Sequence, residues 1–256
     1  MTMPERHGNI ESIEISSILK DLDIEIGTDI HMGDFDVLGW QLAAKIRDKN
    51  SDGYKNHGCL FRPNYERGIL IYSLIQKKGL VNILEIGFGR GYVTACAATA
   101  IHSKGLMGSV TTVDPYHDEQ KLNQFKSALN PAVANMVNIT PVQKTSNDFF
   151  NDLSPDTRFD LIFIDGDHRY EAVANDYQNA IKFIDRGYII MDDYHMPTKV
   201  DKDIDVANFV DTLSSDVDRK LVLTDRLLFN DDRGRNADSL DYGMVLMPIG
   251  DINDEQ

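Results

Sequence analysis

The stretch LEIGFGRGY, residues 84–92, decides the fold, because an apolar segment ends in it, glycines follow, and an amphipathic segment begins. Gly87, Gly89 and Gly91 stand at alternate positions, so the backbone can turn sharply and approach a ligand without a Cβ collision. The start of a helix behind such a loop presents free N–H groups. The stretch therefore predicts a strand, a ligand-binding loop and a helix, although a glycine-rich turn that binds nothing would look the same.

The spacing of the glycines argues against one class of ligand. A dinucleotide-binding loop needs a small residue at the third position of its motif, where the helix packs on the strand. Tyr92 stands at that position here. A nicotinamide-dependent oxidoreductase is therefore a weaker alternative than a protein that binds another nucleoside.

Around this loop, short β-branched segments alternate with amphipathic ones. Segments of the first kind predict strands at 81–86, 109–114, 137–142, 159–165, 187–192, 221–229 and 242–247. The second kind predict helices at 63–78, 92–103, 119–129, 147–153, 170–184 and 204–213. Strands alternating with helices predict an α/β, Rossmann-like, doubly wound fold. We expect a mostly parallel seven-stranded sheet whose last two strands form an antiparallel hairpin at the C-terminal edge.

Composition narrows the class of protein further. The chain has 26 Lys and Arg against 41 Asp and Glu, a formal charge of −15, which disfavours binding to nucleic acids or anionic membranes. Its two cysteines, Cys59 and Cys96, cannot form a disulfide framework, so we expect a reducing, cytoplasmic location. Neither a signal-peptide pattern nor an apolar run of membrane-spanning length is evident, so no membrane association is expected.

Acidic residues flank the glycine loop in a pattern that carries a resemblance. Glu85 precedes the loop, and Asp114 ends the next predicted strand, where a carboxylate can bind ribose hydroxyls. The chain thereby resembles the class I S-adenosylmethionine-dependent methyltransferases, whose first motif is E/D-x-G-x-G-x-G, over roughly residues 80–195. The resemblance implies that S-adenosylmethionine is the cosubstrate. It implies cosubstrate contacts at Glu85, Gly87, Gly89, Asp114, Thr145, Ser146 and Asp165.

More carboxylates end the next two predicted strands, in the segments IDGD (164–167) and DDYH (192–195). Strand ends of an open α/β sheet share one crevice, so Asp165, Asp192 and Asp193 should lie close together. Their repulsion would force some of them to protonate unless a cation compensates. A hard divalent ion such as Mg²⁺ is therefore expected, with these three as ligands. The alternative is that the acids only terminate strands as turn formers.

The two acidic segments resemble those of metal-dependent O-methyltransferases, both the catechol type and, more closely, the macrocin and aminocoumarin sugar type. The resemblance implies Mg²⁺ or another divalent cation, and methyl transfer to a hydroxyl of a small molecule such as a sugar or glycosylated natural product. His195 and Asp167 are the two candidate general bases, with His195 ranked first because its ordinary pKa is about 6.5. The following segment HMPTKVDKDID (195–205) departs from the family pattern, which leaves the acceptor open.

The resemblance also divides the chain. Residues 1–60 are expected to form a partly helical N-terminal lid, residues 61–250 the methyltransferase domain, and residues 251–256 a tail. A homodimer would fit the family. The alternative function is a class I methyltransferase that uses no metal and acts on oxygen or nitrogen.

Overall fold

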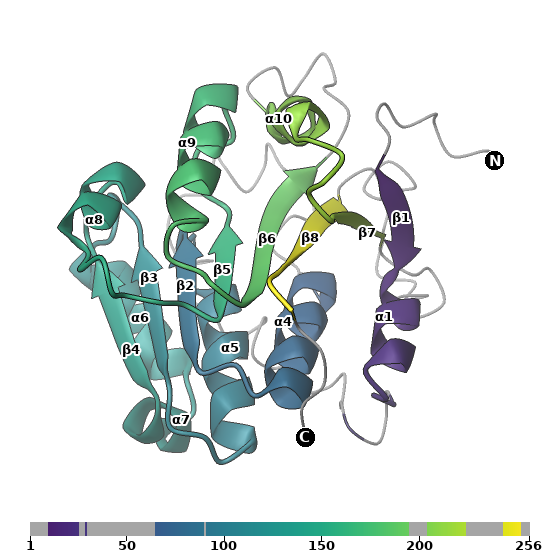
Figure 1. Cartoon of the computed structure of the whole chain (residues 1–256). Helices are drawn as coiled ribbons and strands as arrows, with labels where there is room; N and C mark the ends of the chain where they lie inside the picture. The colour runs from purple at the N-terminus through teal and green to yellow at the C-terminus, as the bar shows by residue number, and fades with distance from the viewer. Residues whose placement is uncertain are drawn as a thin grey trace, which may run out of the picture.

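One mixed sheet forms the centre of the computed structural model, which describes residues 10–25, 29, 65–89, 91–194, 204–223 and 243–251 of the chain. The sheet has eight strands in the order β1-β7-β8-β6-β5-β2-β3-β4 (Figure 1). The strands are β1 (Glu11–Glu14), β2 (Asn82–Ile86), β3 (Ser109–Val113), β4 (Asn138–Val142), β5 (Leu161–Ile164), β6 (Gly187–Tyr194), β7 (Lys220–Leu223) and β8 (Gly243–Ile249). The strands β2 to β6 pair in parallel, so their carboxyl ends meet at one edge.

This topology confirms the expected Rossmann-like α/β fold with an antiparallel pair. Strand β8 runs antiparallel to both β6 and β7. The sheet has one strand more than the seven expected, because β1 pairs in parallel with β7, Glu11 opposite Lys220. The sequence of β1, ESIE, has two charged residues among four, so it lacks the apolar run by which a buried strand is identified.

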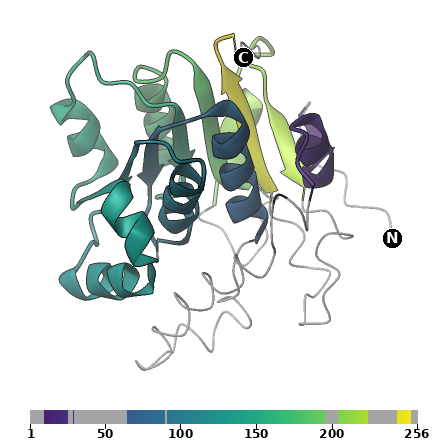
Figure 2. The ribbon, with the colours of Figure 1, turned by 90° about the horizontal axis from the view of Figure 1, so that it is seen from below.

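Helices cover both faces of the sheet (Figures 1 and 2). They are α1 (Ile15–Asp21), α4 (Tyr65–Lys78), α5 (Tyr92–Ser103), α6 (Glu119–Ala128), α7 (Pro131–Met136), α8 (Ser146–Asp152), α9 (Tyr170–Ala180) and α10 (Val206–Thr212). Alternate residues of each strand point to opposite faces. On β2, Ile83 packs in a core with α1, α4, α5, α6 and α7, whereas Leu84 packs in a second core with α8, α9 and α10. The result is a three-layer domain with two cores.

Helix α7 is a second difference from the sequence-based expectation. Pro131 stands at its first turn, and the side chain of Asn130 accepts a hydrogen bond from the backbone N–H of Ala132 at 2.9 Å. Both features are helix-start signals. The segment has only six residues, which is too short for a periodic pattern to predict it.

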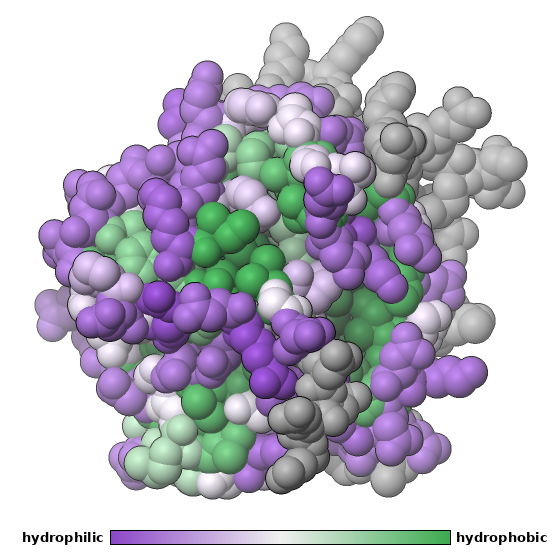
Figure 3. Space-filling view, viewed as in Figure 1, coloured by the Kyte–Doolittle hydropathy of each residue, from purple (hydrophilic) through white to green (hydrophobic). Residues whose placement is uncertain are grey.

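The outer surface is mixed in polarity. Hydrophilic residues cover most of the face seen in Figure 3, and hydrophobic residues gather in patches between them. None of the described helices is both long and apolar enough to cross a membrane.

Candidate active site

The glycine loop is held tightly against the end of β5. Backbone N–H groups continue the sheet beyond the strands, from Gly87 to the carbonyl of Val113 (2.9 Å) and from Asp165 to that of Ile86 (2.8 Å). Gly87 has φ +90°, and a Cβ atom there would lie 1.9 Å from the carbonyl oxygen of Asp165. The structure thus requires glycine at this position for packing within the protein itself.

The other two glycines of the loop differ from each other. Gly91 has φ +80°, and a Cβ there would collide with the rings of Phe88 and Phe125. Gly89 has φ +51°, and no protein atom within the described part of the chain lies within 4 Å of a Cβ built there. Gly89 is therefore the loop residue beside which space for a ligand remains.

Glu85 lies on β2 beneath this loop and is 2% exposed. Its carboxyl group accepts a hydrogen bond from the hydroxyl of Thr94 on α5. Burial raises the pKa of Glu85 from 4.5 to about 8, although the Thr94 hydrogen bond opposes the rise. The side chain is therefore mostly protonated at neutral pH and enclosed under α5. Its predicted contact with the cosubstrate stays a prediction.

Asp114 follows β3 directly, as the sequence predicts. Its backbone N–H donates to the carbonyl of Val142 at 3.1 Å, which places Asp114 at the same sheet edge as the glycine loop. Its carboxylate accepts a hydrogen bond from the backbone N–H of Tyr116 at 2.7 Å, and the residue is 9% exposed. This hydrogen bond fixes the orientation of the carboxylate.

Thr145 and Ser146 begin helix α8 beyond β4. The Thr145 hydroxyl caps the helix, accepting from the N–H of Asp148 (3.2 Å) and donating to its carboxylate (2.8 Å). The Ser146 side chain hydrogen-bonds Asp176, a residue of α9 that is 3% exposed. Burial raises the pKa of Asp176 from 3.8 to about 6, and the Ser146 hydrogen bond opposes that rise. Thr145 thus has a structural role, and Ser146 leads to a buried acid that the sequence analysis does not single out.

Two of the three predicted metal ligands meet, together with a histidine. Oδ1 of Asp165 lies 3.2 Å from Nε2 of His168, and Oδ2 of Asp193 lies 3.5 Å from Nδ1 of the same ring. One ligand atom from each of the three residues lies within 4.8 Å of the others. Burial disfavours the charged imidazolium, but Asp165 and Asp193 outweigh this and raise the pKa of His168.

The backbone brings Asp193 to this position by an irregularity in β6. The register of β6 against β8 shifts between Met191 and Tyr194, and Asp193 has φ +54°. Such bulges re-aim side chains and occur often beside functional sites. In a regular strand Asp192 and Asp193 would point to opposite faces.

The third predicted ligand, Asp192, is paired with an arginine instead. Arg67 on α4 contacts the Asp192 carboxylate through Nε, and its Nη2 lies 3.2 Å from Oδ1 of Asp193. Asp192 is 2% exposed, and burial raises its pKa well above the ordinary value although Arg67 opposes the rise. Burial lowers the pKa of Arg67, but Asp192, Asp165 and Asp193 together hold it above the ordinary value. Arg67 is therefore a charged, partly buried side chain, 16% exposed.

Of the two candidate bases, only Asp167 is described, and it lies outside the cluster. The carboxylate of Asp167 accepts hydrogen bonds from the Arg169 guanidinium, with Nε 2.9 Å away, and this pairing lowers the pKa of Asp167. His195 lies outside the described residues. Neither assignment as a base is tested by these positions.

Sequence reasoning missed three residues of this region. His168 stands just before the predicted helix at 170–184 and is not among the expected site residues, although its three-residue spacing from Asp165 could have signalled the contact. Arg67 lies 126 residues before Asp193 in the chain, so no local pattern links the two. Asp176 looks like any polar residue of an amphipathic helix until its burial is known.

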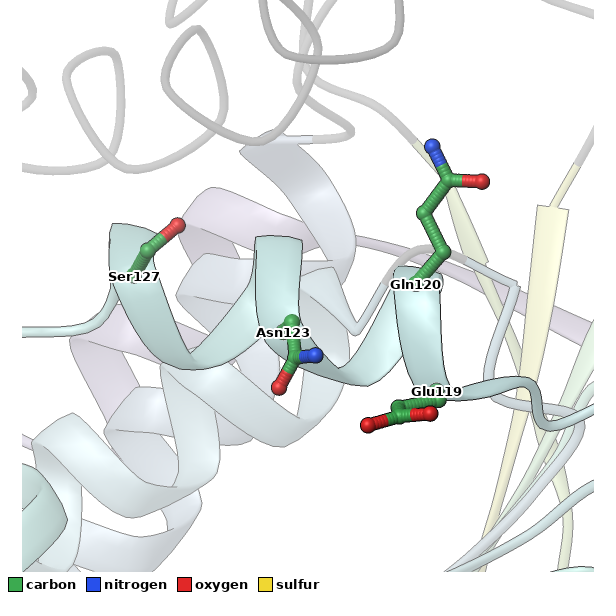
Figure 4. A pocket seen from close by; sticks show the side chains of 4 residues that line it. All are labelled: Glu119, Gln120, Asn123 and Ser127. Carbon is green, nitrogen blue, oxygen red and sulfur yellow. The ribbon is translucent and has the colours of Figure 1, made fainter.

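One surface depression lies elsewhere. It is lined by Glu119, Gln120, Asn123 and Ser127, which project from successive turns of α6 (Figure 4). All four side chains are exposed, and none belongs to a strand end. The strand-end residues, not this depression, form the candidate active site.

Comparison with known proteins defines the class. Residues 84–194 match the family described as a methyltransferase domain. This segment, with its glycine loop and Rossmann-like topology, is therefore similar to a methyltransferase domain in both sequence and fold.

Solved structures share the fold over most of their length. Cofactor-bound Rv0187 from MTB has a TM-score of 0.60 at 17% identity, covering 92% of this chain and 95% of that one. The O-methyltransferase TomG from Streptomyces achromogenes, in complex with SAM, has a TM-score of 0.55 at 18% identity, covering 84% and 90%. The O-methyltransferase from Bacillus cereus in complex with SAH has 0.53 at 18%, covering 91% and 96%.

A curated relative matches over a short segment. Uncharacterized protein R132 of Acanthamoeba polyphaga mimivirus is 50% identical over 36 residues, which are 14% of this chain. The match spans only 16% of that protein's length. It therefore carries no information on function.

Proposed function

We propose that the protein transfers a methyl group from S-adenosylmethionine to a hydroxyl oxygen of a small molecule, with a divalent cation bound at the acidic cluster. One observation carries this proposal. Asp165, His168 and Asp193 lie at the same sheet edge as the glycine loop, so a cation site would adjoin the cosubstrate. The solved O-methyltransferases with the same fold support oxygen as the acceptor atom.

The cosubstrate would lie across the carboxyl ends of β2 and β3. Gly89 leaves space above the loop, and the carboxylate of Asp114 is placed to accept hydrogen bonds from the ribose hydroxyls. Backbone bonds that extend the sheet hold Asp114 to Val142 and the glycine loop, through Gly87, to Val113. Their part is to position the sulfonium methyl group for in-line attack, which lowers the entropic barrier.

The residues of the acidic cluster suit a divalent cation. Carboxylate oxygens and an imidazole nitrogen are common metal ligands, and their donor atoms here lie close enough to share one ion. A bound cation would lower the pKa of the acceptor hydroxyl and fix its position. The fold supplies the ligands from the ends of β5 and β6, where the acceptor oxygen must meet the methyl group.

The acceptor oxygen forms a bond to the methyl carbon as the carbon–sulfur bond breaks, and its proton passes to a base. His195 and Asp167 are the proposed bases. Asp167 would have to leave its ion pair with Arg169 to accept that proton, because its lowered pKa makes it a weak base. His195 therefore stays first.

A metal-free class I methyltransferase is the second candidate. Its support is Arg67, a partly buried guanidinium that contacts both Asp192 and Asp193 and compensates their charge. In that case Arg67 and His168 would balance the carboxylates, and methyl transfer to nitrogen or oxygen would rest on positioning alone. No contact in the described residues favours a nicotinamide enzyme.

The acceptor class follows from charge and resemblance. A chain of formal charge −15 repels polyanions, so we propose a neutral or cationic hydroxylated molecule, such as a sugar or glycosylated natural product, and no nucleic-acid substrate. A homodimer and a cytoplasmic location belong to the same proposal. A lid in the N-terminal region would exclude β1 and α1, because these elements belong to the sheet and its core.

Thermal denaturation with added ligands tests the proposal. S-adenosylhomocysteine at 100 times its dissociation constant should stabilise the folded state by about 2.7 kcal/mol, whereas NAD⁺ should not. A divalent ion should give a further shift that excess EDTA reverses. Stabilisation by S-adenosylhomocysteine without any ion effect would favour the metal-free candidate, and no stabilisation by it would contradict the proposal as a whole.

A further inference from the structure

The pairing of Arg67 with Asp192 separates the three strand-end carboxylates into two groups. Asp192 is 2% exposed and lies against the guanidinium, whereas the carboxylates of Asp165 and Asp193 are 31% and 17% exposed. Arg67 also reaches Oδ1 of Asp193 through Nη2 at 3.2 Å, which leaves Oδ2 of Asp193 for another partner. Separating Asp192 from Arg67 would leave the Asp192 carboxylate buried without its cation, which is strongly unfavourable. Asp192 is therefore held in its ion pair with Arg67, and the third ligand of a bound cation would have to be another residue.

His168 stands where that third ligand is needed. Its ring lies 3.2 Å from the Asp165 carboxylate and 3.5 Å from that of Asp193. Two ligands bound at about 2.1 Å to one ion lie roughly 3.0–3.4 Å apart in octahedral or tetrahedral geometry. The separation between Asp165 Oδ1 and His168 Nε2 falls in that range. Asp193 Oδ2 lies nearest the other ring nitrogen, Nδ1, and one donor atom of each of the three residues lies within 4.8 Å of the other two.

We propose that Asp165, His168 and Asp193 are the ligands of the ion, that Arg67 keeps Asp192 out of the ligand set, and that the site therefore selects a divalent transition-metal ion over Mg²⁺. This inference rests on the proposed function in so far as an ion binds at this edge. Mg²⁺ strongly prefers oxygen ligands, whereas imidazole nitrogen suits first-row transition metals. Two carboxylates also balance one divalent charge, once Arg67 has compensated Asp192.

Binding of single ions to the full-length protein tests the ligand set. We expect Mn²⁺ to bind at least ten times more tightly than Mg²⁺ in calorimetry. Pulsed electron paramagnetic resonance of bound Mn²⁺ should show coupling to a ¹⁴N nucleus, and His168→Ala should abolish that coupling. Bound Mn²⁺ without nitrogen coupling, or Mg²⁺ bound as tightly as Mn²⁺, would overturn the ligand set. The proposed methyl transfer would stand in either case.

The role of Arg67 is tested by releasing Asp192. Arg67→Gln should raise Mg²⁺ affinity about tenfold or more, because a third carboxylate becomes available. Arg158→Gln is the matched control, because it removes the same charge from a surface ion pair with Asp185. Equal Mg²⁺ affinity in Arg67→Gln and the control would contradict the inference.

A double variant tests the ligand set without leaving a single unpaired charge in the protein interior, which could unfold it. Arg67→Met with Asp192→Leu replaces the buried pair by apolar side chains, an exchange that proteins often tolerate. Mn²⁺ should bind this variant within about threefold of the wild-type affinity, with nitrogen coupling intact. Loss of Mn²⁺ binding there would show that Asp192 is a ligand. If neither ion binds the wild-type protein, metal dependence fails as well, while S-adenosylhomocysteine binding still tests the methyltransferase itself.

Discussion

The carbonyl oxygen of Asp165 occupies the position that a side chain on residue 87 would need, only 1.9 Å from a Cβ built on Gly87. The first and fourth strands of the methyltransferase domain, β2 and β5, therefore end in direct backbone contact. Gly87 belongs to the glycine loop and Asp165 to the acidic cluster. A shift of either loop must move the other, which keeps the two halves of the site in register.

Exchanging single glycines of the loop should separate packing from binding. Gly87→Ala combines a left-handed backbone with a backbone collision, so we expect a loss of roughly 2–5 kcal/mol in the free energy of unfolding. Gly89→Ala meets only the backbone penalty of about 1–2 kcal/mol, yet its methyl group enters the space left for a ligand. Urea denaturation and calorimetry with S-adenosylhomocysteine measure the two effects. Equal stability of the two variants would contradict this reading of the loop.

Asp114→Ala should weaken S-adenosylhomocysteine binding by about 1.5–3 kcal/mol, the value of a hydrogen bond to a charged group. Asp118→Ala is the control. Asp118 caps α6 by accepting from the N–H of Lys121 at 2.6 Å, so its loss should lower stability by about 1 kcal/mol without changing affinity. Calorimetry measures the affinity of both variants for S-adenosylhomocysteine. Equal affinities would show that Asp114 does not bind the ribose.

Glu85→Gln should alter how stability depends on pH. The wild-type carboxyl has a pKa of about 8 when folded and about 4.5 when unfolded, so its contribution is fully present below 4.5 and is lost as the pH rises to 8. The glutamine variant does not titrate. We expect the stability of wild type relative to the variant to fall steadily between pH 4.5 and 8 in urea denaturation. Parallel curves would mean that Glu85 is ionised in the folded state.

Asp176→Asn should show the same sign in a lower pH window. The pKa of Asp176 is about 6 when folded against 3.8 when unfolded, so wild type should lose about 3 kcal/mol relative to the variant between these pH values. Above pH 6 the difference should stay constant. A difference that is flat from pH 4 to 7 would contradict the raised pKa. Because Ser146 touches Asp176, calorimetry at pH 5 and 7 can also show whether S-adenosylhomocysteine binding follows the titration.

The sequence predicted the parallel part of the fold well because its strands are buried on both faces. Segments such as FDLIFID (159–165) must be apolar at every position, which is a strong local signal. The edge strand β1 carries no such signal because water meets Glu11 and Glu14. Asp114, Asp165 and Asp192 were predicted to lie near one edge of the sheet, because parallel strands place their carboxyl ends on the same side.

The sequence did not predict which residues contact these side chains. The ion pair between Arg67 and Asp192 depends on the position of α4 relative to β6. The spacing of residues within 84–194 does not predict that position. The bulge that turns Asp193 toward His168 depends on the register of β6 against β8, a strand about 50 residues later. Ligand sets taken from strand ends therefore need the tertiary structure to decide among neighbouring carboxylates.

The pairing of β1 with β7 has a consequence for biosynthesis. Lys220 leaves the ribosome 209 residues after its partner Glu11. At 5–20 residues per second, the first strand waits about 10–40 s for the strand it must join. Throughout that interval its two glutamates discourage association with other nascent chains, since charged edges resist intermolecular pairing. The acidic character of this short segment thus protects the newly made chain until its last strands arrive.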